Sequence, residues 1–105
     1  MLRLMADGRI REWTKYLPDG FVIQVYMKTV RGRVVSFSAV LIKDGQCITR
    51  YDTAHGFPHR DVIGKKGATI HKEKCTILTL EEVFRYADED LSQNYAKYHA
   101  YYEEN

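Results

Sequence analysis

The spacing of the apolar residues changes along the chain, and this change constrains the fold more than any other feature. Residues 21–30 place Phe21, Ile23, Val25 and Met27 on one face at alternate positions, with Gln24 and Lys28 on the other. Such alternation predicts a β-strand with one buried face. Toward the C-terminus the apolar residues instead recur every three or four positions, which predicts an amphipathic helix. The sequence therefore predicts a sheet followed by a helix.

Three further segments are predicted to be strands. Residues 34–43 continue the alternation, with the inward positions taken by Val35, Phe37, Ala39 and Leu41. Asp44-Gly45 follows as a hairpin signal, because both turn residues tolerate positive φ. The remaining strands are predicted at residues 46–53 and 68–78. Residues 9–17 fit helical spacing and strand alternation equally well, so their state stays open.

The helix is predicted over residues 80–104. Thr79 and Glu82 form a capping-box pattern at its start. Its core-facing stripe consists of Leu80, Val83, Phe84, Ala87, Leu91, Tyr95, Tyr98 and Tyr102. At about 1.5 Å per residue the helix exceeds 35 Å, which is longer than a small sheet needs. The tyrosine-rich end is thus expected to overhang, either meeting a second copy in a homodimer or fraying into solvent.

Together these segments predict an α+β fold, an antiparallel sheet of about four strands with one long C-terminal helix packed on one face. With 105 residues, 45% of them hydrophobic, we expect a single domain over residues 1–105. Residues 1–8 are a candidate disordered tail, and Met5 is an alternative start. The run MLRLM is too short for a signal-peptide core and no apolar run can span a bilayer, so we expect a cytoplasmic protein without a membrane partner.

Charge is unevenly distributed. The net charge is +2, but residues 1–80 carry +7 and residues 81–105 carry −5. Such a chain can attract a polyanion to one face and repel it from another. Alternatively, the two parts attract each other across the fold. The two cysteines, Cys47 and Cys75, do not form a Cys-x-x-Cys motif, and we expect both to be reduced and half-buried.

Residues 54–67 are predicted to be a long loop and are the candidate functional segment. Long loops in compact domains tend to be functional or disordered, and this one holds His55, His59, Arg60, Lys65 and Lys66. Two imidazoles beside cations suit phosphodiester cleavage without metal, because one takes a proton, the other returns it and a cation stabilises the phosphate. The predicted catalytic residues are His55, His59 and Arg60. The predicted substrate-binding residues are Arg50, Tyr51, Asp52, Lys65, Lys66 and His71.

Other interpretations of these residues stay open. A metal site would combine His55, His59 and His71 with Asp52 or Asp61, although Gly56-Phe57-Pro58 disfavours the helix that a His-x-x-x-His pair needs. We therefore predict neither metal nor cofactor. Arg50 and Asp52 also suit a cross-strand ion pair, or hydrogen bonds that hold a turn. RNA binding without catalysis would use cations and stacking rings: Arg31, Arg33, Arg50, Arg60, Lys65 and Lys66, with Tyr51 and Phe57.

The run Arg50-Tyr51-Asp52-Thr53-Ala54-His55-Gly56-Phe57-Pro58-His59-Arg60, with the opening Leu80-Glu81-Glu82-Val83 of the helix, resembles small prokaryotic proteins close to the TumE-like toxins of toxin–antitoxin pairs. The resemblance covers residues 46–90. It implies a four-stranded sheet with a helix, an activity directed at RNA or translation, and a cognate antitoxin as partner. Arg50, Asp52, His55 and His59 match the pattern, whereas Asp61 stands where members often carry a further histidine.

Two functions therefore compete. One is a toxin-like RNA-directed factor or metal-independent ribonuclease. The other is a non-catalytic interaction or dimerisation module, which predicts an exposed apolar or aromatic patch and histidines locked in structural hydrogen bonds.

Overall fold

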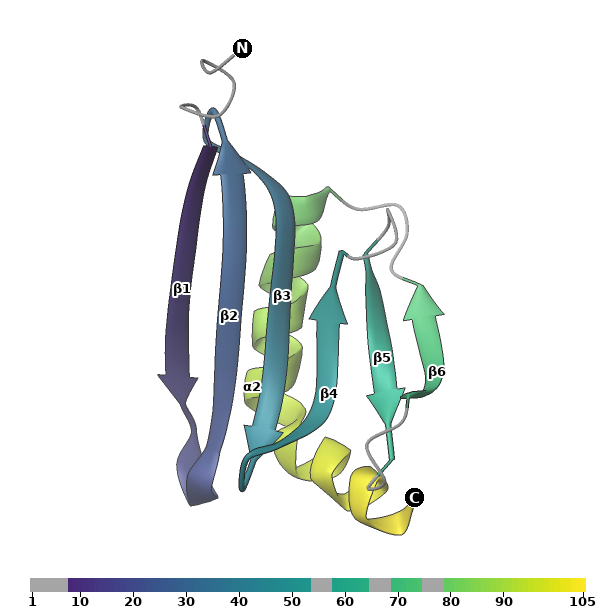
Figure 1. The fold of residues 1–105 in the computed structure, drawn as a ribbon. Helices are drawn as coiled ribbons and strands as arrows, with labels where there is room; N and C mark the ends of the chain where they lie inside the picture. Colours follow the sequence, from purple (N-terminus) through teal and green to yellow (C-terminus); the bar gives the residue numbers. More distant parts are fainter. Residues whose placement is uncertain (1–7, 54–57, 65–68, 75–78) are drawn as a thin grey trace.

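The computed structural model describes residues 8–53, 58–64, 69–74 and 79–105, with only the backbone described for residues 70–74. These residues form a six-stranded antiparallel sheet with one long helix, α2 (Leu80–Glu104), packed on one face (Figure 1). The strands follow one another in chain order: β1 (Gly8–Tyr16), β2 (Phe21–Val30), β3 (Arg33–Lys43), β4 (Gln46–Asp52), β5 (His59–Ile63) and β6 (Thr69–Lys74). The predicted α+β class is confirmed, and the sheet has more than the roughly four strands expected.

Two segments account for the additional strands. Residues 9–17, which the sequence left undecided, lie mostly in β1, where Trp13 contacts Phe84 of the helix at a ring distance of 6.0 Å while Ile10 is exposed. The predicted loop 54–67 was wrong in its central part, because His59–Ile63 pair as β5 with both β4 and β6. Gly8 likewise begins β1 and does not belong to a tail, and β6 lies within the predicted strand 68–78, of which residues 68 and 75–78 lie outside the described residues.

Tight turns join the long central strands. In both turns φ is positive at the two central residues: 53° at Arg31 and 78° at Gly32, and 52° at Asp44 and 77° at Gly45. Positive φ at both central residues gives the twist that suits a two-residue hairpin. The Asp44-Gly45 hairpin predicted from the sequence is therefore confirmed.

The core lies between the sheet and α2. Phe21, Ile23, Val25 and Met27 are all buried, as the alternation predicted. Four positions of residues 34–43 were expected to point inward, and the prediction was wrong for Val35, which is 44% exposed. The register between β2 and β3 shifts at this point, since Lys28 pairs with Ser36 and Thr29 with Val34. Val35 is the extra residue of this bulge and is left without a partner on β2.

The helix starts with the predicted capping box. The Thr79 hydroxyl accepts from the backbone amide of Glu82, and the Glu82 carboxylate accepts from the amide of Thr79. Hydrogen bonds from backbone amides lower the pKa of Glu82 and also that of Glu81, which accepts from Val34.

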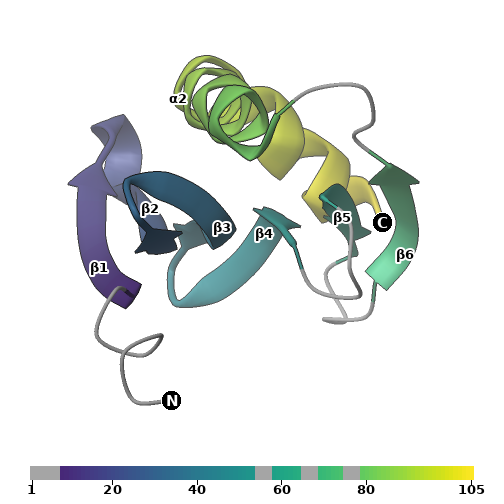
Figure 2. The same cartoon turned by 90° about the horizontal axis from the view of Figure 1, so that it is seen from above.

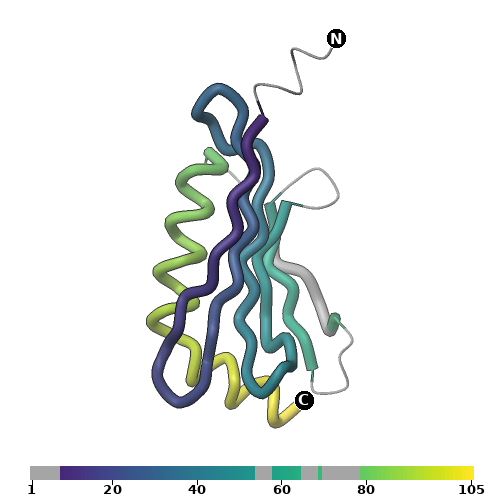
Figure 3. Tube along the Cα trace, turned by 60° about the vertical axis from the view of Figure 1, so that its left-hand side comes forward, coloured from purple at the N-terminus to yellow at the C-terminus, as the bar shows by residue number. Residues whose placement is uncertain are grey.

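The expected overhang of the helix was wrong, because α2 bends at Asn94. Asn94 has φ −117° and ψ 17°, outside the helical range. Its side-chain amide donates to Oδ1 of Asp90 at 2.7 Å. Beyond the bend, the last turns pass across the ends of β4 and β5 (Figures 1 and 3). Tyr102 is consequently buried, with its hydroxyl bonded to Gln46, and Tyr101 is left exposed.

The helix covers one face of the twisted sheet, and no other described element covers the opposite face, which we call the uncovered face (Figure 2). The charge asymmetry follows these layers, since the basic part of the sequence forms the sheet and the acidic part forms α2. Among the described residues, Lys15 pairs with Asp88 at 3.5 Å and Arg33 with Glu81 at 3.4 Å between the layers. Within the described part of the chain, no helix has the length and apolar content needed to cross a membrane.

Candidate functional site

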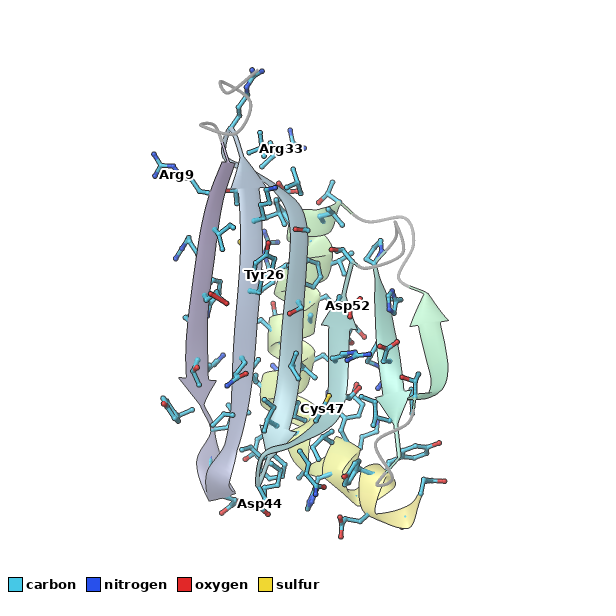
Figure 4. The ribbon with its side chains drawn as sticks, viewed as in Figure 1. Arg9, Tyr26, Arg33, Asp44, Cys47 and Asp52 are labelled. Atoms are coloured by element: carbon cyan, nitrogen blue, oxygen red, sulfur yellow. The ribbon has the colours of Figure 1, made fainter. Side chains whose placement is uncertain are left out.

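The register of β4 and β5 brings four ionisable residues together. Arg50 pairs with Asp61, and Asp52 pairs with His59. Because side chains two residues apart in a strand share a face, all four lie on the same face of the sheet. That face is the uncovered one, since Tyr51, between Arg50 and Asp52, points to α2 and bonds Asp90. Figure 4 shows Asp52 on β4 on this side. We call these four residues the His59 cluster.

The atoms of the His59 cluster are arranged around two carboxylates. Nε2 of His59 lies 3.1 Å from Oδ1 of Asp52 and 3.3 Å from Oδ1 of Asp61. Nε of Arg50 donates to Oδ2 of Asp61 at 2.7 Å and lies 3.6 Å from Oδ2 of Asp52. Each carboxylate thus turns one oxygen to the imidazole and the other toward the guanidinium.

Burial varies across the cluster. The side chains of His59 and Asp61 are each 1% exposed, Asp52 is 16% exposed and Arg50 is 41% exposed. A buried carboxylate needs a charged or hydrogen-bonding partner, and Arg50 supplies one to Asp61. The hydrogen bond that Arg50 donates to Asp61 raises the pKa of Arg50, so the guanidinium keeps its charge. The cluster is therefore a buried polar centre that reaches solvent through Arg50 and Asp52.

The opposite face of the same strands carries a second polar network. Asp90 of α2 accepts hydrogen bonds from the Tyr51 hydroxyl at 2.6 Å and the Tyr98 hydroxyl at 2.5 Å, in addition to the one from Asn94. Burial, followed by the hydrogen bond to Asp90, raises the pKa of both tyrosines. The guanidinium of Arg60 lies 4.7 Å from the Tyr98 ring centre and donates to Thr49 at 3.1 Å. This network joins the sheet to the helix.

The structure brings some of the predicted site residues together in the His59 cluster and places others on the helix side of the sheet. His59 joins Arg50 and Asp52, but Arg60 points to the helix side, because consecutive strand residues face opposite ways. Tyr51 was proposed to stack on a ligand, yet it is 3% exposed and its hydroxyl is bonded to Asp90.

Other predicted residues are not described in the structure. His55, Lys65 and Lys66 lie outside the described residues. His71 is described by its backbone alone, which pairs with Val62.

The predicted ion pair between Arg50 and Asp52 also takes a different form. The two residues are neighbours on one strand, and the cross-strand partner of Arg50 is Asp61. Cys47 is half-buried as expected, with a free thiol whose pKa burial raises. Cys75 lies outside the described residues.

Two acidic residues of these networks were not among the predicted site residues. Asp61 was considered only as an alternative metal ligand, although its position two residues after His59 would place both on one face of a strand. Asp90 was missed because it precedes Leu91 of the apolar stripe. The signal was the polar spacing of Asp90, Asn94 and Tyr98, at positions i, i+4 and i+8 of one helix face.

A family model described as "Domain of unknown function (DUF7718)" matches residues 5–105. The chain belongs to the DUF7718 family. No curated protein and no solved structure matches it. The match covers all of the elements described above, so the sheet, α2 and both polar networks are parts of this DUF7718 domain. It carries no information on the resemblance to TumE-like toxins.

The His59 cluster of the DUF7718 domain has the groups for three kinds of chemistry. An imidazole oriented by a carboxylate can transfer a proton. A guanidinium can bind a phosphate. An imidazole nitrogen and two carboxylate oxygens that converge can bind a divalent cation.

Proposed function

We propose that this protein is an RNA-directed factor and that RNA binds across the face of the sheet that α2 leaves uncovered. The observation that carries the proposal is the composition of that face. Tyr16, which is 80% exposed, and Tyr26 lie there, as do Lys28 and Arg50. Single-stranded RNA binds sheet faces by stacking bases on aromatic rings and by placing its phosphates against cations.

The separation of charge between the layers supports the same proposal. The acidic helix lies behind the sheet, so a polyanion bound to the uncovered face is kept apart from the acidic residues of α2. Lys28 and Arg50 supply positive charge on this face, whereas Lys15 and Arg33 pair with acidic residues of α2. The resemblance of residues 46–90 to TumE-like toxins also points to RNA or translation as the target.

Binding is tested by fluorescence anisotropy with a labelled single-stranded RNA of mixed sequence. Tyr16→Ala should weaken binding about tenfold, since stacking one base contributes about 1–3 kcal/mol. The matched control is Tyr86→Ala, because Tyr86 is 57% exposed but lies on α2. Lys28→Glu should weaken binding and lower its salt dependence, whereas Lys97→Glu on α2 should not. Equal effects of the sheet and helix variants would refute the binding face.

Cleavage of the bound RNA is the catalytic form of this proposal. The burial of His59 does not favour direct transfer of a proton between its imidazole and a phosphodiester. We therefore assign this proton transfer to His55. Incubation with the same RNA in EDTA tests this assignment. Loss of cleavage in His55→Ala, with binding retained, would support the metal-independent ribonuclease; full cleavage by His55→Ala would refute it. Growth arrest on expression, relieved by a neighbouring gene, would support a toxin with a cognate antitoxin.

A non-catalytic interaction module is the second candidate. The observation that favours it is that Ile10, on the same uncovered face as Tyr16 but near the other end of β1, is 61% exposed. The helix end offers less to a homodimer, because Tyr102 is buried in the chain's own core. Light scattering distinguishes the two candidates. Two results together would establish the interaction module: the protein forms a dimer that Ile10→Asp dissociates, and it has no affinity for RNA.

A further inference from the structure

We propose that Asp52, His59 and Asp61 form a binding site for one divalent transition-metal ion, with Arg50 holding the two carboxylates in place. This inference is independent of RNA binding. It also differs from the metal site considered from the sequence, which relied on three histidines. Of those three histidines, His59 has a described side chain and is proposed as a ligand here, and both aspartates take part.

The distances within the cluster suit a shared ion. Bonds from a metal such as zinc to nitrogen or oxygen are about 2.0–2.2 Å, so neighbouring ligand atoms lie about 3.0–3.5 Å apart in octahedral or tetrahedral geometry. Nε2 of His59 lies 3.1 Å from Oδ1 of Asp52 and 3.3 Å from Oδ1 of Asp61. One ligand atom from each of the three residues lies within 4.8 Å of the others. The two separations that involve His59 thus match those between neighbouring ligands of one ion, and the two aspartate ligand atoms are close enough to share it.

Arg50 orients the two carboxylates. It donates to Oδ2 of Asp61 at 2.7 Å and lies 3.6 Å from Oδ2 of Asp52, so both Oδ1 atoms turn toward the imidazole. Groups that fix the free oxygen of a ligand carboxylate commonly raise metal affinity. Arg50 therefore acts from the far side of the carboxylates and does not occupy the position of the ion.

The charge and the donor set indicate the class of ion. The two carboxylates supply negative charge that attracts a divalent cation. One imidazole nitrogen with two carboxylate oxygens suits manganese, iron, cobalt or zinc. Magnesium prefers oxygen ligands alone and holds its water tightly. Asp52, at 16% exposure, gives the ion a route from solvent.

Metal binding to the full chain tests the proposal. Chelator-treated protein is titrated with Co²⁺ by visible absorption and with Zn²⁺ by calorimetry. We expect saturation at one equivalent with each metal and no competition from millimolar Mg²⁺. Asp52→Asn keeps the shape of the side chain and should weaken binding at least about tenfold. Asp88→Asn on α2 is the matched control and should bind as the unchanged chain does.

Two further readouts keep the test decisive. Circular dichroism establishes that Asp52→Asn is folded; His59→Gln serves as the second variant and should lose the Co²⁺ absorption bands. Binding that Asp52→Asn and His59→Gln both leave unchanged would come from other groups, such as the cysteines, and would overturn the proposal. Absence of saturable binding would do the same, as would competition by Mg²⁺. None of these readouts involves RNA, so the metal site and the RNA-binding face stand or fall separately.

Discussion

Arg50 and Asp61 face each other across β4 and β5, and Nε of Arg50 donates a 2.7 Å hydrogen bond to Oδ2 of Asp61. The carboxylate is buried, whereas the guanidinium is 41% exposed. The pair therefore fixes a buried negative charge from the solvent side, and it explains how Asp61 is tolerated within the sheet.

Removal of Arg50 should show how much free energy the burial of the Asp61 carboxylate costs. Arg50→Leu is expected to lower the free energy of unfolding by about 2 kcal/mol, less than for a fully buried pair because water screens the exposed guanidinium. The measurement is urea unfolding followed by circular dichroism. Arg33→Leu, at an exposed ion pair with Glu81, is the control and should change stability by less than about 0.5 kcal/mol. In Arg50→Leu/Asp61→Leu, stability should recover in part; a further loss would contradict this account.

The Asp90 network should contribute to stability through each of its donors. Tyr98→Phe removes one hydrogen bond to the Asp90 carboxylate and is expected to cost about 1.5–2 kcal/mol, as for hydrogen bonds to charged groups. Thermal and urea unfolding measure the loss. Tyr101→Phe removes a hydroxyl from an exposed tyrosine three residues away and should be neutral. Equal stabilities of the two variants would show that Tyr98 contributes nothing through its hydroxyl.

The same tyrosines should make the fold sensitive to alkali. Burial and then the hydrogen bond to Asp90 raise the pKa of Tyr51 and Tyr98 above the usual value of 10.0. Above that pH the unfolded chain loses these protons while the folded chain retains them, so stability falls as pH rises. The free energy of unfolding should keep its full value below about pH 9 and decline steadily above about pH 10.

Urea unfolding at several pH values between about pH 8 and pH 11 measures this decline. In Tyr98→Phe the slope should be shallower, because one of the two protons no longer contributes. Tyr86→Phe alters an exposed ring and is the control. If Tyr98→Phe and the unchanged chain decline in parallel, another group is responsible.

The capping box at the start of α2 provides a local test. Thr79→Ala removes the oxygen that accepts from the Glu82 amide at 3.2 Å and should cost about 1 kcal/mol. Thr79→Ser keeps that oxygen and should retain most of the stability. Hydrogen exchange at the amides of the first helical turn should accelerate in the alanine variant alone; equal exchange in both variants would exclude a role for the cap.

Most of the fold was predictable from the sequence, because local patterns specify it. The alternation of residues 21–27, the Asp44-Gly45 turn and the capping box of Thr79 each depend on neighbours in the chain, and each is confirmed. The missed strand β5 had no such signal. Its residues His59, Arg60 and Asp61 are charged or ionisable, and only their pairing between β4 and β6 makes them a strand.

The candidate site was predictable only in part for the same reason. Arg50, Asp52 and His59 were named from the sequence, yet Arg60 was grouped with them because a loop sets no alternation of faces. Once residues 59–63 form a strand, alternation sends Arg60 to the helix and brings Asp61 beside His59. Thus the sequence by itself determined the class of fold, the length of the helix and its cap, since these follow from local periodicity and local hydrogen bonds. The tertiary structure alone decided the cluster, because only strand register converts separation along the chain into proximity between carboxylate, imidazole and guanidinium.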